Sequence, residues 1–513
     1  MKVKLSKVNI RYTIAGLLGM LLVSCGGSKI ESATNDSDSQ ETLDTLNTSL
    51  SAGDTLPPFE PIASQFDHET IILPEGFTYK VLFSEKSDFV KRSDGEIFPA
   101  KGKHDLTVFV PSDEDPENKG ILYISHETSG PNADLGDGGG ATVFDIELKD
   151  ETWEVVSEFH HVDFSSIGFT DRNCGGSIGP NGNVFTCEET WGYDNEYFTK
   201  KGLADRKFDT GLPMWQNVGY VVEVDPREKK VVKRHMTMGK LVHEDVHFTN
   251  DGKTCYITDD YSPGVFFKLE MPSSGDFDNG QLYAYKQSED GESGSWLELP
   301  MDTNSLVNCR RIAVEKGATL IIRHEWIEEI NGKLYISETG EDHFSWKESI
   351  ERGGTVPNYV SENLAKSDVE FDDPFGRIVM FDPETNKMSS YLEGGFFSDS
   401  SGCFSNPDCN TSVNLNGKNY LVISEDINWH DRGRAGEDAE QTKAFYNEIY
   451  FLDMSIESPT ADDLLRFCVA PVGSETTGVI FLPDGSMVMN VQHPKASNVE
   501  PFNRSVTILV EGF

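Results

Sequence analysis

One local pattern recurs six times along this chain, and it restricts the fold more than any other feature. Each copy contains a turn with glycine, a short apolar strand and then an acidic residue or a histidine. The copies lie about 60 to 90 residues apart, enough for a four-stranded sheet and one long insertion each. This spacing predicts an all-β protein, a six-bladed β-propeller with long insertions. The copies are residues 118–127, 181–189, 251–260, 331–338, 416–426 and 484–493.

The turn at the start of each copy supports the strand assignment. Five copies open with Asn-Gly or Asp-Gly. Both central residues of a type I′ hairpin turn need positive φ, which these residue pairs adopt readily. Further strand patterns, such as residues 218–225 and 377–382, fit the other strands of the blades.

The strands nearest the axis of a propeller end on one rim of the central channel. We therefore expect the acidic or histidine ends of the six copies to converge there. Asp and Glu can also simply terminate a strand, but six copies in the same phase favour a common site. Clustered carboxylates repel one another unless cations neutralise them, so a metal site is predicted.

The formal net charge of -42 excludes some partners. A strongly acidic protein is repelled by nucleic acid and by anionic membrane surfaces, so neither is expected as a partner. Most of the 86 acidic residues serve only as a solvated surface. The oligomeric state is not predicted.

The N-terminus has the features of an export signal. Lysines precede an apolar run over residues 12–23, which is too short to span a membrane, and the run ends in Leu22-Val23-Ser24-Cys25. This ending resembles the bacterial lipobox, in which the cysteine receives lipid. We predict a lipoprotein signal peptide over 1–24, a lipidated Cys25, a disordered acidic and Ser/Thr-rich tether over 25–58 and the propeller over 59–513. The protein would be exported and anchored to a bacterial membrane only through this lipid, on the periplasmic or the cell-surface face.

Seven cysteines follow Cys25, so at least one lacks a disulfide partner in an oxidising compartment. Cys403 and Cys409 lie close enough in sequence to close a small loop, but the pattern leaves the connectivity open.

Residues 172–189 place Cys174 in a glycine-rich loop before a strand that ends Thr-Cys-Glu-Glu. This segment resembles the PhoX-type alkaline phosphatases, whose signature has an Asn-Cys-x-Gly-Gly loop and a Thr-Cys-Glu-Glu strand end. The resemblance extends over roughly residues 66 to 497. Further matches are His104-Asp105, His126-Glu127, His243-Glu244, Asp259-Asp260, the stretch 317–325, Asn406-Pro-Asp408 and Gln492-His-Pro494.

The resemblance implies a six-bladed propeller with a central cluster of Fe(III) and Ca²⁺ ions. Hard Ca²⁺ prefers oxygen ligands, whereas a thiolate is a soft ligand that suits a transition metal. Cys174 would therefore bind iron. The residues that would supply oxygen ligands are Glu127, Glu188, Glu189, Glu244, Asp260, Glu325 and Asp426.

Arg323 matches the arginine with which the family grips the phosphoryl group, and a guanidinium group suits two phosphate oxygens. With Cys174 and Glu325 it forms the predicted catalytic set. The alternative is that Arg323 only pairs with nearby acids. His493 is more easily explained as a structural residue than as a ligand, and Cys187 and Cys255 as small core residues.

The chain departs from the family pattern in four places. The loop after Cys174 continues Ile178-Gly-Pro-Asn-Gly instead of Thr-Pro-Trp-Gly, and His324 stands where proline is usual. Cys409 replaces a common asparagine. No Arg-Arg pair precedes the apolar run, which implies unfolded export and metal loading outside the cytoplasm.

The sequence thus predicts a metal-dependent phosphatase that hydrolyses small phosphate monoesters outside the cytoplasm. In this interpretation bound cations offset the phosphate charge, and Arg323 stabilises the charge that develops in the transition state. One alternative is a calcium-dependent propeller lactonase or phosphotriesterase, which needs no iron and no thiolate. The other is a surface propeller that binds a ligand without catalysis.

Overall fold

The computed structural model describes residues 57–65, 68–190, 195–202, 212–360, 371–399, 402–427 and 446–513. The chain divides into Met1–Thr55 and Leu56–Phe513, and the described residues all belong to the second unit. Cys25, the predicted signal peptide and all of the predicted tether except Pro57 and Pro58 lie outside the described residues. None of the described helices is long and apolar enough to cross a membrane.

All six strands predicted from the repeat are present. In two copies both turn residues have positive φ, at Asn331-Gly332 and Asn416-Gly417, as a type I′ turn requires. In the copies that open at 181, 251 and 484, only the glycine has positive φ, so those turns are of a different type. The strands are β5 (Lys119–His126), β10 (Val184–Glu188), β14 (Thr254–Asp259), β21 (Lys333–Glu338), β29 (Lys418–Glu425) and β33 (Met487–Gln492).

The described residues form six sheets of four or more strands, which we number in chain order from the inner strand outward. Sheet I contains β4 (His104–Pro111), β5, β6 (Ala141–Lys149), β8 (Phe159–His161), β2 (Phe89–Lys91) and β3 (Ile97–Pro99), with β7 (Thr152–Val155) also paired to β6. Sheet II contains β9 (Asn173–Ile178), β10, β11 (Val221–Asp225) and β12 (Lys230–His235). Sheet III contains β13 (His243–Phe248), β14, β16 (Phe267–Glu270), β17 (Gln281–Gln287) and β18 (Gly294–Glu298).

The remaining three large sheets follow the same plan. Sheet IV contains β20 (His324–Ile330), β21, β24 (Arg377–Asp382) and β25 (Lys387–Glu393). Sheet V contains β28 (Pro407–Leu415), β29, β30 (Glu448–Asp453) and β31 (Leu464–Val469). Sheet VI contains β32 (Glu475–Phe481), β33, β34 (Val506–Glu511) and β1 (Thr78–Ser84).

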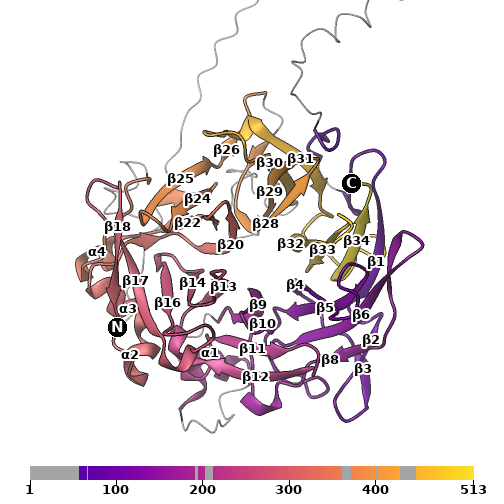
Figure 1. The fold of residues 1–513 in the computed structure, drawn as a ribbon, viewed down its shortest axis with the longest axis horizontal. Helices are drawn as coiled ribbons and strands as arrows, with labels where there is room; N and C mark the ends of the chain where they lie inside the picture. The colour runs from indigo at the N-terminus through magenta and orange to yellow at the C-terminus, as the bar shows by residue number, and fades with distance from the viewer. Residues whose placement is uncertain are drawn as a thin grey trace, which may run out of the picture. The chain divides into compact units, whose positions relative to one another are not determined.

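The innermost strands of these sheets form a closed ring. β4, β9, β13, β20, β28 and β32 contact one another in this order, and β32 returns to contact β4. Figure 1 shows these strands nearest the centre, with the other strands of each sheet extending outward. The predicted all-β propeller arrangement is therefore confirmed. One detail of the prediction was wrong, because the repeated strands are second in their sheets and the strand before each one lies at the axis.

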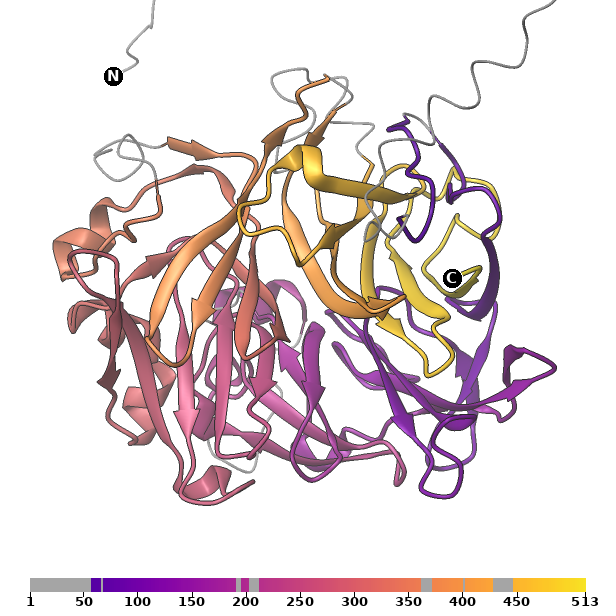
Figure 2. The same ribbon diagram turned by 45° about the horizontal axis from the view of Figure 1, so that its top comes forward.

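The two ends of the described chain complete one sheet together. β1 pairs antiparallel with β34, from Thr78 opposite Glu511 to Ser84 opposite Val506. This pairing joins the start of the described region to its end, as Figure 2 shows from a tilted view. A ring closed in this way leaves no open seam between the first and last sheets.

The core lies between neighbouring sheets. Between sheets III and IV, for example, Phe266, Tyr285 and Phe381 are fully buried and contact one another edge to face. Burying an aromatic side chain of this size contributes about 2 to 3 kcal/mol relative to leaving it exposed.

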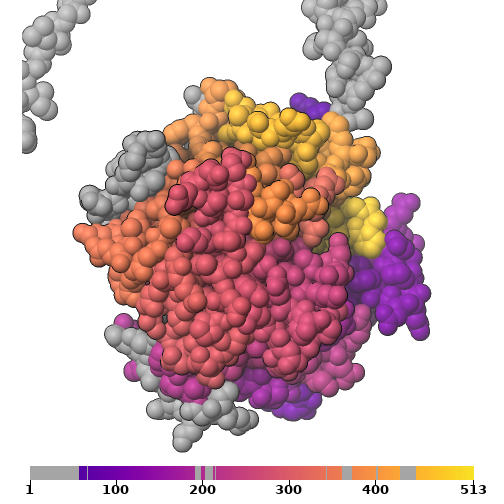
Figure 3. All heavy atoms as spheres, turned by 60° about the vertical axis from the view of Figure 1, so that its left-hand side comes forward, coloured from indigo at the N-terminus to yellow at the C-terminus, as the bar shows by residue number. Residues whose placement is uncertain are grey.

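Short elements fill the insertions between strands. They are α1 (Asn195–Lys200), α2 (Thr303–Val307), α3 (Cys309–Glu315), α4 (Lys347–Arg352) and the small pairs β15–β19 (Gly264–Val265, Leu320–Ile321), β22–β23 (Glu341–Phe344, Phe371–Asp373) and β26–β27 (Gly395–Phe396, Cys403–Phe404). α2, α3 and α4 lie outside the inner ring, beside β16 to β18. Figure 3 brings this side forward, and its pink and orange atoms from the middle of the chain cover the near face.

Candidate metal centre

A repeated backbone hydrogen bond builds the site at one end of the sheets. Because the first two strands of each sheet are antiparallel, the end of the second strand lies beside the start of the inner strand. In five sheets the residue just before the inner strand accepts, at its carbonyl, the N–H of the residue just after the second strand, at 2.9 to 3.0 Å. The pairs are Lys103 with Glu127, Arg172 with Glu189, Val242 with Asp260, Arg323 with Thr339 and Asn406 with Asp426.

In three sheets the carboxylate at the last residue of the second strand is bound by neighbouring protein groups. Glu188 accepts hydrogen bonds from Thr170 Oγ1 at 2.9 Å, from the N–H of Gly219 at 3.0 Å and from Arg234 Nη2 at 2.9 Å. Asp259 and Glu338 hold the equivalent position and pair with Arg310 and Arg377. Both oxygens of Glu188 are used in these bonds, and Glu188 belongs to neither of the two compact acidic groups of the centre.

Residues that directly follow the second strands, together with residues of the inner strands, form the central cluster. Glu127, Glu189, Asp260, Asp426 and His493 follow the second strands, whereas Asp105, Cys174, Glu244, Glu325, Asp408 and Glu475 belong to the inner strands. Two groups are compact enough to hold an ion. One donor atom from each of Glu244, Glu325 and Asp408 lies within 4.8 Å of the others, and the same holds for Asp426, Glu475 and His493.

Several carboxylates of the central cluster raise one another's pKa, whereas at Glu127 the charges of Arg172 and Lys103 outweigh burial and lower the pKa to about 2. Burial, followed by Glu325 and Asp408, raises the pKa of Glu244 well above its usual value. Burial and then Glu475 and Asp426 do the same for Asp408, which connects the two groups. The pKa of Asp105 is raised to about 7 by burial and by Glu127. So many buried acids in one place store repulsion that a bound cation relieves.

Cys174, on inner strand β9, lies close to the acids of the cluster, although neither of the two compact groups includes its sulfur. Its buried thiol donates to the carbonyl of His243 at 3.1 Å and lies 3.6 Å from the carbonyl oxygen of Glu244. Burial, followed by Glu244, raises its pKa well above the usual value. A thiolate at this position therefore needs a cation beside it. Cys187 and Cys255 are buried in the core, as predicted.

Arg323 is placed at the edge of the Glu244, Glu325 and Asp408 group. Its Nε lies 2.7 Å from Asp260 Oδ1, and its Nη2 lies 3.1 Å from Glu325 Oε1. Its φ of 57° lies in the left-handed region, which is rare outside glycine and often marks a functional position. The predicted catalytic residues Arg323 and Glu325 are thus in contact.

The donor set suits bound cations. Carboxylate oxygens, which hard cations prefer, dominate it, and one thiol, a softer donor, lies near them. Oδ1 of Asp408 is buried and has no hydrogen-bond partner among the described residues, so a ligand position is open there.

Sequence reasoning missed part of the cluster. Asp105 and Asp408 lie at the second position of their inner strands, as Glu325 does. The available signal in the sequence was their place in the His104-Asp105 and Asn406-Pro-Asp408 motifs. Glu475 carried no comparable motif. His493, interpreted from sequence as structural, lies with its Nε2 3.0 Å from Glu475 Oε2. The described cysteines form no disulfide with one another, so a bond between Cys403 and Cys409 is not formed.

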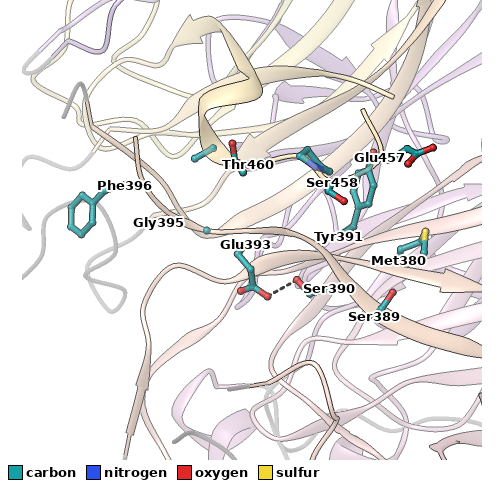
Figure 4. Close-up of a pocket in the computed structure, with 13 residues that line it drawn as sticks. Met380, Ser389, Ser390, Tyr391, Glu393, Gly395, Phe396, Glu457, Ser458 and Thr460 are labelled. Carbon is teal, nitrogen blue, oxygen red and sulfur yellow. Dashed lines mark hydrogen bonds between the residues drawn. The ribbon is translucent and has the colours of Figure 1, made fainter. Parts of the chain in front are cut away.

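A surface groove lies on a different part of the molecule. It has a volume of about 640 Å³ and is lined by residues of β24, β25 and β26 and by the segment 457–461. Figure 4 shows Phe396 and Glu457 on opposite sides of it. None of the thirteen lining residues belongs to the central cluster.

Comparison with known proteins identifies the family. A family model described as alkaline phosphatase PhoX matches residues 147–495, more than half of the chain. Pseudomonas fluorescens PhoX, solved in complex with vanadate, a transition state analogue, has 18% sequence identity and a TM-score of 0.65, covering 88% of this chain and 98% of that chain. At this identity the match shows the fold.

Other solved structures are more distant. Trichoderma reesei Carbohydrate-Active Enzymes Family AA12 has 11% identity and a TM-score of 0.40, covering 88% of this chain and 99% of that chain. Trypanosoma rangeli sialidase has 12% identity and a TM-score of 0.36, covering 86% of this chain and 60% of that chain. No curated protein matches the sequence significantly. The family match and the shared fold agree, and the chain belongs to the alkaline phosphatase PhoX family of phosphoric monoester hydrolases.

Proposed function

We propose that this phosphatase hydrolyses small phosphate monoesters outside the cytoplasm by means of a central iron and calcium cluster. The observation that carries the proposal is the buried set of carboxylates and one thiol with Arg323 in contact with two of its acids. Each of the six large sheets would be one blade of a six-bladed propeller around this cluster. Export and the lipid at Cys25 are part of the proposal and rest on the N-terminal sequence alone.

The ligands divide by chemistry. Cys174 would bind iron through its sulfur. Glu127, Glu189, Glu244, Asp260, Glu325 and Asp426, predicted from sequence, would supply oxygens together with Asp105, Asp408 and Glu475. Glu188 would act indirectly, because Arg234 and two backbone N–H groups hold its carboxylate behind the cluster. When bound, the cations would neutralise phosphate oxygens and activate the attacking nucleophile.

The protein's own groups position the substrate. Arg323 can direct two guanidinium N–H groups at the phosphoryl oxygens, and Asp260 and Glu325 hold it from two sides. The backbone at Arg323 has the left-handed φ of 57° that is often found at functional positions, and the two ion pairs hold its guanidinium group. A donor held in place in this way stabilises the developing charge without reorganising during the reaction.

Metal analysis combined with two matched cysteine variants tests the proposal. The purified protein should contain iron and calcium, show a visible absorption band and hydrolyse p-nitrophenyl phosphate. Cys174→Ser should lose or strongly shift the band, with iron content and activity falling together, because a serine oxygen is a harder ligand than sulfur. Cys187→Ser, the matched control, should keep colour and iron, because Cys187 is packed in the core.

Two results would contradict the proposal in different ways. A colourless, iron-free parent with full turnover would favour a calcium-only hydrolase. A parent with its full metal content that hydrolyses no phosphate ester would favour a binding propeller.

A further inference from the structure

Two further basic residues occupy the backbone position of Arg323 in other sheets. Lys103 directly precedes the inner strand of sheet I and Arg172 that of sheet II, as Arg323 precedes that of sheet IV. The carbonyl of each accepts the N–H of the residue that follows its second strand. Their φ angles are 49°, 47° and 57°, so all three have the same left-handed backbone. The same local geometry thus directs three cations to one end of the ring.

Lys103 and Arg172 meet on a single carboxylate. Lys103 Nζ lies 3.0 Å from Glu127 Oε2, and Arg172 Nη2 lies 2.5 Å from Glu127 Oε1. Arg172 also pairs with Glu189. Since Glu127 and Glu189 are proposed metal ligands, bound cations would share these carboxylates and leave both basic groups with charge to offer a substrate.

The order of the ring separates this pair from Arg323. Inner strand β4 contacts β32 and β9, whereas β20 contacts β13 and β28. Sheet I therefore lies opposite sheet IV, with the central cluster between Lys103 and Arg323. The two sides also differ in exposure, because 39% of the Lys103 side chain and 26% of the Arg172 side chain are accessible, against 11% for Arg323. The Lys103 and Arg172 side chains are therefore more accessible to an incoming ligand than the Arg323 side chain.

We propose that Lys103 and Arg172 form a second anion-binding position, which binds a carboxylate or a second phosphate on the alcohol part of the substrate. This inference rests on the proposed function and defines its substrate class. Arg323 binds the phosphoryl group that is transferred, and the alcohol part extends across the cluster toward the pair. In a chain with a net charge of -42, these two converging basic side chains would select an ester that carries a second anionic group over an ester whose only anionic group is the phosphate.

A matched pair of substrates tests the inference. Glycerol 3-phosphate and 3-phosphoglycerate differ at the far carbon, where a hydroxymethyl group is replaced by a carboxylate. With the metal-loaded parent, kcat/KM should favour 3-phosphoglycerate at least about tenfold, the range of one charge-assisted hydrogen bond. Lys103→Gln and Arg172→Gln should each reduce this ratio about tenfold. The control Lys80→Gln, which removes a half-exposed lysine from outer strand β1, should leave the ratio unchanged.

The ratio of the two kcat/KM values distinguishes a loss of selectivity from a loss of metal. A variant that binds less metal loses activity on both substrates in parallel, so its ratio does not change. In the parent the ratio should also fall as NaCl is raised from about 50 to 500 mM, since salt screens exposed charges. Turnover of both substrates at a ratio near one, or a ratio that Lys103→Gln leaves unchanged, would overturn the inference alone and make Lys103 a structural partner of Glu127. A loaded parent that hydrolyses neither ester would overturn the proposed function and the inference with it.

Discussion

Replacing Asp408 with asparagine should stabilise the cation-free protein and destabilise the cation-loaded protein. Asp408, Glu244 and Glu325 each place a donor atom within 4.8 Å of the other two. At that separation two unit charges repel by about 3.5 kcal/mol when the effective dielectric constant is about 20. Asp408 faces two such neighbours, so the repulsion that Asp408 itself experiences is about 7 kcal/mol when all three carboxylates are ionised. Proton uptake relieves part of this repulsion, as the raised pKa of Asp408 shows.

We therefore expect Asp408→Asn to raise the free energy of unfolding of the chelator-treated protein by about 2 to 4 kcal/mol near pH 8, less than the full repulsion. Calcium should reverse the order. A cation at 100 times its Kd stabilises the folded protein by about 2.7 kcal/mol, and the variant should lose most of this gain because it lacks one ligand. Urea denaturation with chelator and with saturating calcium measures both effects.

Glu425→Gln is the matched control. The Glu425 carboxylate accepts the N–H groups of Ser405 and Glu448, both at 3.0 Å, so its replacement should lower stability in both conditions. If Asp408→Asn also destabilises the chelated protein, the carboxylates do not repel one another and the cation site is refuted.

Three further predictions follow from the site and the N-terminus. Burial and Glu127 raise the pKa of Asp105 from 3.8 to about 7, so between these pH values the folded state binds more protons than the unfolded state. The free energy of unfolding of the chelated protein should therefore fall as the pH rises from about 4 to 7. A rise in the urea midpoint over that range would contradict the assignment. Arg323→Ala should lower kcat/KM for aryl phosphates by about two to three orders of magnitude while metal content stays the same, as steady-state kinetics and metal analysis can measure. The exposed control Arg311→Ala should keep the parent rate, and an unchanged rate in Arg323→Ala would leave Arg323 as an ion-pair partner only. Cys25→Ser should release the protein from membranes in a sedimentation assay, because lipid is the only anchor proposed; a variant that still sediments in high salt would refute the lipoprotein prediction.

The local sequence determined the strands and much of the site. Gly-containing turns followed by short apolar runs specify strands without reference to distant residues, and all six predicted strands are present. The acidic residues that follow these strands could be predicted because the same local repeat contains them. Glu127, Glu189 and Asp426 follow second strands directly, and the repeat shows their phase.

Tertiary structure decided which of two adjacent acids faces the cluster. Glu188 and Glu189 are neighbours in sequence, but successive residues of a strand point to opposite sides. Glu188 is consequently bound by Arg234 within its own sheet, and Glu189 reaches Arg172 at the cluster. No property of the two residues by themselves distinguishes them.

Contacts between residues of different sheets also cannot be predicted from the local sequence. Lys103, Glu127 and Arg172 come from three separate segments, and only the pairing of strands and the order of the ring bring them together. Asp408 shares its position with Glu325 only once both inner strands are known. Local patterns are set by backbone preferences over a few residues, whereas the charge balance at the centre depends on which sheets become neighbours when the ring closes.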